Sequence, residues 1–109
     1  MVWRKEFGLP WKIPQEVLDL VDRGLLEDRS WHNDMGPSFW RDLDRGLSVV
    51  LWVNHPQKAK REYVDERFLV QMVDREGGVG YPADIVATDD LGQALRAIDE
   101  AAAGVWKAR

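Results

Sequence analysis

The chain has 109 residues, of which 45% are hydrophobic and 31% are charged, and this composition is typical of globular domains rather than disordered or fibrous chains. Its length leaves room for one hydrophobic core, so we expect residues 1–109 to form a single domain. The chain has no cysteine, which excludes a disulfide framework, a thiolate zinc site and a cysteine nucleophile. The net charge of −4 argues against indiscriminate binding to nucleic acid or anionic membranes.

The N-terminal residues bear on location and on the start of the fold. Residues 1–6 carry charges without the apolar stretch that follows them in a signal peptide, and the longest apolar run, residues 49–53, is too short to span a bilayer. We therefore expect a cytoplasmic protein. The spacing of Trp3, Phe7 and Leu9 predicts that residues 1–12 form an N-terminal strand or an arm laid over the core.

Two helices are predicted, one near each end of the chain. Val17, Leu18 and Val21 recur at helical spacing and predict a helix over residues 14–23, which Gly24 ends in a left-handed conformation. Thr88 is a good N-cap for the second helix, over residues 89–103. Its apolar stripe is expected at Leu91, Leu95, Ile98 and Ala102.

Between the helices the apolar period changes to two, which indicates strands over residues 38–43, 47–54, 66–74 and 83–88. The strand from 47 to 54 is apolar on both faces and is therefore expected at the centre of the sheet. The short connections favour an antiparallel arrangement. The sequence thus predicts an α+β fold, an antiparallel four-stranded meander with an N-terminal and a C-terminal helix packed on one face.

One loop, residues 30–38, is dense in reactive groups. It contains His32 and Asp34, and the other histidine, His55, closes the central strand. If the three converged, they could form a two-histidine, one-carboxylate metal site and support a metal-assisted hydrolase. Because a histidine two residues before an aspartate is not a specific motif, we expect no joint binding of a divalent ion and assign no cofactor.

The other motifs do not point to a catalytic or nucleotide-binding site. Ser38 lacks the glycine and the helix that follow a nucleophile elbow. The glycines at 77–80 lack the lysine of a phosphate-binding loop. The basic cluster at 58–61 is followed at once by acidic residues, which argues against a nucleic-acid surface.

The chain has six tryptophans, and two of them flank a predicted hairpin turn. Alternation places Trp40 opposite Phe39 and Trp52 opposite Leu51, so we expect at least one of the two rings, Trp40 or Trp52, on the face that the helices leave uncovered. With Val50 beside them they would form an apolar patch, which in monomers marks an interaction surface. We expect this face to be covered by the N-terminal arm or by a second copy, with a slight preference for self-association as a homodimer.

The sequence therefore favours a non-catalytic protein-interaction or accessory module over an enzyme. Its interface is expected at Trp40, Val50 and Trp52, and its partner is another protein or a second copy of the chain. The pattern identifies no small-molecule substrate. The small hydrolase built on His32, Asp34 and His55 is the alternative.

Overall fold

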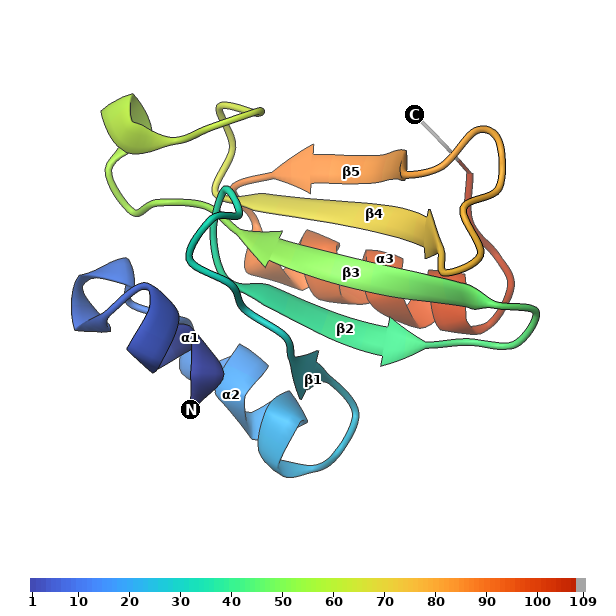
Figure 1. Ribbon diagram of the computed structural model, residues 1–109, viewed down its shortest axis with the longest axis horizontal. Helices are drawn as coiled ribbons and strands as arrows, with labels where there is room; N and C mark the ends of the chain where they lie inside the picture. Colours follow the sequence, from blue (N-terminus) through green and yellow to red (C-terminus); the bar gives the residue numbers. More distant parts are fainter. Residues whose placement is uncertain (108–109) are drawn as a thin grey trace.

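The computed structural model describes residues 1–107 and has an α+β fold (Figure 1). Five antiparallel strands form one sheet, and each lies beside its neighbour in the sequence. The strands are β1 (Glu27–Asp28), β2 (Ser38–Asp42), β3 (Leu47–Val53), β4 (Phe68–Asp74) and β5 (Ala83–Thr88). The predicted antiparallel meander is confirmed, with one strand more than expected, and β3 lies at its centre.

The helices are α1 (Val2–Glu6), α2 (Gln15–Asp22) and α3 (Leu91–Ala102), with short 3-10 helices at Leu9–Trp11 and Lys58–Lys60. Figure 1 shows α3 behind the sheet and α1 and α2 near the β1 edge. Leu20 of α2 lines the same small pocket as Leu95 and Ile98 of α3, which places α2 in the α3 layer. No helix within residues 1–107 has the length and apolar character needed to cross a membrane.

The core lies between the sheet and the helical layer. Every second side chain along the three middle strands points toward it, as a period of two requires. These side chains are nearly or completely buried: Phe39, Val49, Leu51, Val53, Phe68, Val70 and Met72. Val17 of α2 and Ile98 of α3 join the same cluster. This packing fixes which side chains of the sheet face away from the helices.

The strand that the sequence did not predict is β1. Glu27 and Asp28 pair with Trp40 and Phe39 of β2. Two charged residues have no apolar alternation, so no strand is predicted from them. The strand ends at Asp28. The carboxylate of Asp28 accepts hydrogen bonds from the backbone N–H of Trp3 at 2.8 Å and from the Ser30 hydroxyl at 2.6 Å.

The N-terminal residues form helix α1 rather than the predicted strand. In the helical conformation Trp3 enters the core cluster, while Phe7 packs edge-on against Trp11 at 4.9 Å. Burial of a tryptophan ring contributes more free energy than any local preference of such a short segment. Since Trp3 belongs to the core on the helical side, the N-terminal segment does not cover the opposite face of the sheet.

The second predicted helix is present as α3, with two differences in detail. Its N-cap is Asp90, whose carboxylate accepts from the backbone N–H of Gln93, and not Thr88. Its buried stripe consists of Ala94, Ala97, Ile98 and Ala101, rather than the larger residues at 91 and 95. Small side chains are buried here because they let the helix approach the sheet closely.

Candidate functional site, the open face of the sheet

We call the face of the sheet opposite α2 and α3 the open face. Strand pairing places on it the side chains of Ser38, Trp40, Asp42, Ser48, Val50, Trp52, Leu69, Gln71, Val73, Asp84 and Ala87. In Figure 1 no helix crosses in front of this face. Trp40 and Trp52 both lie on it, where alternation predicted one of the two, and neither belongs to the core cluster.

Part of the open face is inaccessible to solvent even without a helix over it. Val50 and Leu69 are almost completely inaccessible, although no helix lies over them. Trp40 pairs with Val50 and Trp52 pairs with Leu69, so the half-buried indole rings are the large groups that can shield them. We expected the N-terminal arm or a second copy to cover this face. The arm does not cover it, because Trp3 packs in the core cluster on the helical side, and cover by a second copy stays a prediction.

Hydrogen bonds fix the orientation of both indole rings. The Nε1–H of Trp40 donates to the Ser38 hydroxyl at 3.0 Å, and the Nε1–H of Trp52 donates to the Gln71 side-chain oxygen at 2.9 Å. Both partners are buried polar residues of the same face. A ring held in this way loses little conformational entropy on binding, which favours recognition.

Beside Trp40 lies a compensated charge cluster. The Arg29 guanidinium donates to both carboxylate oxygens of Asp42, at 3.1 and 2.8 Å, and to Glu27 at 3.0 Å. Its central carbon lies 5.2 Å from the Trp40 ring centroid, a cation–π contact. Arg75 reaches Asp42 from the other side at 3.5 Å. The chain's own arginines thus neutralise this carboxylate.

We expect this cluster to contribute to the acid sensitivity of the fold. Hydrogen bonds from Arg29 and Ser48 lower the pKa of Asp42 from 3.8 to about 2. The unfolded chain therefore binds more protons in this range, so the stabilisation is complete above about pH 5 and is lost as the pH falls toward 2. Asp42→Asn should lower the free energy of unfolding by less than about 1 kcal/mol near neutral pH, because the pair is partly exposed.

Urea denaturation at several pH values checks this expectation. The difference between Asp42→Asn and the wild type should shrink as the pH approaches 2. Asp99→Asn removes an α3 carboxylate that has no ion pair with any described residue and is the control, which should show no comparable trend. An equal loss for Asp42→Asn at all pH values would contradict the assigned pKa shift.

On the other side of the open face a hydrogen-bonded chain links three strands and a loop. The Gln71 amide nitrogen donates to Asp84 at 2.7 Å, while the amide oxygen accepts from Trp52. The Tyr63 hydroxyl donates to the same aspartate at 3.2 Å. Among the described residues Asp84 has no lysine, arginine or histidine within ion-pair distance.

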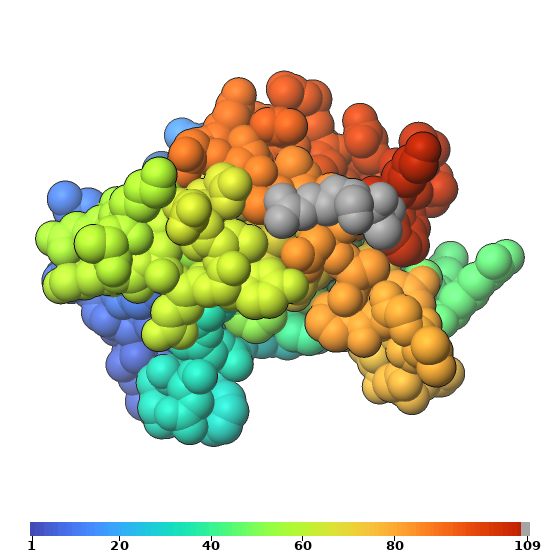
Figure 2. Space-filling model, turned by 90° about the horizontal axis from the view of Figure 1, so that it is seen from above, coloured from blue at the N-terminus to red at the C-terminus, as the bar shows by residue number. Residues whose placement is uncertain are grey.

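Two loops flank the open face. Figure 2 shows that the β1–β2 loop (cyan) and the β4–β5 connection (gold) project away from α3 (red), with a hollow between them. Trp31 in the first loop and Val79 in the second have exposed side chains. The open face is therefore the floor of a concave surface with an apolar residue in each flanking loop.

The three residues of the predicted polar site have separate surroundings. His32 Nδ1 lies 2.9 Å from the Glu6 carboxylate, and the His55 ring packs edge-on against Trp11 at 4.8 Å. Burial raises the pKa of Asp34. Within residues 1–107 no group of three or more histidine, aspartate or glutamate side chains is placed to hold a metal ion. The structure thus gives the hydrolase alternative no assembled metal site.

The pKa of His55 is lowered, chiefly by burial and then by the positive charge of Lys60. Its Nδ1 accepts a hydrogen bond from the backbone N–H of Gln57 at 2.9 Å. This nitrogen is therefore engaged in the loop that follows β3. The arrangement gives His55 a structural role at the end of the strand.

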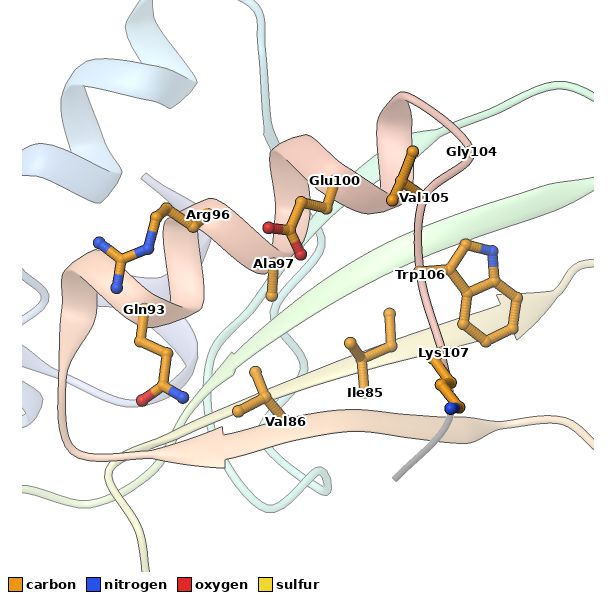
Figure 3. Close-up of a pocket in the computed structure, with 10 residues that line it drawn as sticks. All are labelled: Ile85, Val86, Gln93, Arg96, Ala97, Glu100, Gly104, Val105, Trp106 and Lys107. Carbon is orange, nitrogen blue, oxygen red and sulfur yellow. The ribbon is translucent and has the colours of Figure 1, made fainter.

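A separate pocket of about 700 Å³ lies between β5 and α3 (Figure 3). Ile85 and Val86 form its floor, and Arg96 and Glu100 of α3 line its wall, with Trp106 at one end. Its described lining includes one carboxylate, and no histidine, serine or threonine. A Ser-His-Asp triad would need further groups, and no constellation of this kind occurs among the described lining residues.

Sequence reasoning located the tryptophans of the open face but missed Arg29, Tyr63, Gln71 and Asp84. One signal was present, because Gln71 is a lone polar side chain inside the apolar strand Phe68–Val73. A buried polar residue requires a hydrogen-bond partner. That requirement indicates that Gln71 has hydrogen-bond partners, but it does not identify them.

Comparison with known proteins finds no match to this chain among protein-family models, curated proteins or solved structures.

Proposed function

We propose that this protein is a non-catalytic binding module that receives another protein on the open face of its sheet. The observation that carries the proposal is the hollow between the two projecting loops, whose floor holds Trp40 and Trp52 in fixed orientations. Tryptophan is enriched among the residues that dominate binding energy at protein interfaces.

The composition of the open face supports a transient partner rather than a permanent one. Val50 and Leu69 are already buried in the isolated chain, and polar side chains such as Gln71 and Asp42 lie on the same face as the rings. Non-obligate interfaces are about as polar as the rest of a protein surface, whereas permanent ones resemble a hydrophobic core.

Site-specific crosslinking tests the proposal. A photoreactive phenylalanine analogue is placed at Trp31 or Val79, whose side chains are exposed in the flanking loops, and at Asp99 on α3 as the control. In an extract of the source cells we expect both loop positions to form the same adduct and the control position to form none. Excess unmodified protein should suppress this adduct.

Two results would count against the proposal. An adduct formed equally well from Asp99, or no adduct from either loop position, would remove the open face as the binding surface. An adduct of exactly two chains would show that the partner is a second copy, which sedimentation velocity at micromolar concentration would confirm independently.

A further inference from the structure

The open face contains the same combination of groups twice, and within residues 1–107 a cation completes one of them. In the first, a tryptophan and a carboxylate, Trp40 and Asp42, hold the Arg29 guanidinium between them. The arginine contacts the ring at 5.2 Å and the carboxylate at 2.8 Å. This part of the face shows how a cation is accommodated on the sheet.

The second combination consists of Trp52 and Asp84, which Gln71 connects. Its amide oxygen accepts from the indole and its amide nitrogen donates to the carboxylate, so one side chain positions both groups. No cation–π contact to Trp52 and no ion pair to Asp84 occurs among the described residues. In the described part of the chain, this half of the face therefore has the aromatic ring and the negative charge without the cation.

We infer that Trp52 and Asp84 together receive a cationic side chain of the protein that docks on the open face, and this inference rests on the proposed function. An ammonium or guanidinium group over an indole ring is attracted by the ring's quadrupole. The carboxylate adds a charge-assisted hydrogen bond. Arginine fits best, because its planar guanidinium can stack on the ring and bond the carboxylate at once.

Charge also selects this partner over a second copy of the chain. The Arg29 and Arg75 side chains compensate Asp42 on the open face, whereas no basic residue among residues 1–107 pairs with the half-buried Asp84. A second copy would bring an identical face with the same uncompensated carboxylate, within a chain of net charge −4. A basic segment of a different protein is the complementary occupant.

The inference can be tested with a capped tetra-arginine peptide followed by ¹⁵N NMR at low salt. We expect saturable shifts of the Trp52 indole N–H and the Gln71 side-chain amide. The neutral tetra-citrulline peptide, which has nearly the same shape, should leave both signals in place. Raising the salt toward about 1 M, where the Debye length is about 3 Å, should abolish the shifts.

Two variants with the same change in net charge make the test specific to the site. Asp84→Asn keeps an oxygen acceptor for Gln71 and Tyr63 and should weaken peptide binding about twofold to fivefold. Asp99→Asn, on the opposite side of the protein, should leave the affinity unchanged. Equal binding by Asp84→Asn and the wild type, equal weakening by both variants, or binding of the citrulline peptide would overturn the inference.

The outcome is distinguishable from that of the crosslinking experiment. Suppose that a partner crosslinks to the loops at Trp31 and Val79 and binds Asp84→Asn as tightly as the wild type. This result would support the proposed function and contradict the inferred cation site. Arginine binding at Trp52 together with crosslinks only from Asp99 would leave a cation site and remove the proposed docking surface.

Discussion

Replacing Leu51 by aspartate is expected to unfold the protein. Leu51 is completely buried on the central strand, between Phe39 of β2 and Val70 of β4. The core cluster around it consists of apolar side chains, so the new carboxylate would have neither a cation nor a hydrogen-bond donor. The cost of burying such a charge, several kcal/mol, is comparable to the total stability of about 5–15 kcal/mol that a domain has.

Circular dichroism at increasing temperature measures this effect. Val79→Asp introduces the same charge at a fully exposed position of the β4–β5 connection and should melt like the wild type. Leu51→Ala should lie between the two, with a loss of about 2–5 kcal/mol from the cavity alone. A wild-type melting temperature for Leu51→Asp would show that this position is not in the core.

The second large effect is expected for Asn54→Ala, which should cost about 2–4 kcal/mol of unfolding free energy. Asn54 is completely buried and its amide nitrogen donates to the backbone carbonyls of Glu62 and Val64 at 3.0 and 3.1 Å. Its side-chain oxygen accepts from the backbone N–H groups of His55 and Glu62. Alanine would leave these partly buried groups without their partner.

Urea denaturation gives the free energy, and amide hydrogen exchange shows where the change occurs. Exchange should accelerate first between residues 54 and 67, because these hydrogen bonds hold that loop. Asn33→Ala is the matched control, since Asn33 is an exposed asparagine in another loop. A loss for Asn33→Ala as large as that for Asn54→Ala would show that the effect does not depend on the buried network.

Local patterns predicted most of the sheet. The period of two along Leu47–Val53 and Phe68–Asp74 identifies both strands to within two residues, and the turn at residues 43–46 follows from its glycine and aspartate. The strand at Glu27–Asp28 was not predicted, because it has no internal periodic signal, and the helix at Val2–Glu6 was predicted as a strand or arm from the spacing of Trp3, Phe7 and Leu9. Both depend on contacts far along the chain, such as the bond from Trp3 to Asp28.

In the candidate site, too, local patterns predicted some residues, while the others depend on contacts between segments far apart in the sequence. Alternation alone separated Trp40 from Phe39 and Trp52 from Leu51, and so indicated a tryptophan on the open face. The groups that hold and complement them come from other segments: Gln71 lies 19 residues after Trp52, and Asp84 lies 13 residues after Gln71. Arg29 precedes its partner Asp42 by 13 residues. Such pairs form only once the register of the sheet is set, which no local pattern specifies.

The order of the strands has a kinetic consequence. Because every strand pairs with its sequence neighbour, the sheet can form by the addition of successive hairpins. No strand has to pair with one that is distant in the sequence. Among its connections the segment from 54 to 67 is the longest, and closing a longer loop costs more entropy. We therefore expect the joining of β4 to β3 to limit the folding rate, and the hydrogen bonds of Asn54 to set how fast that step occurs.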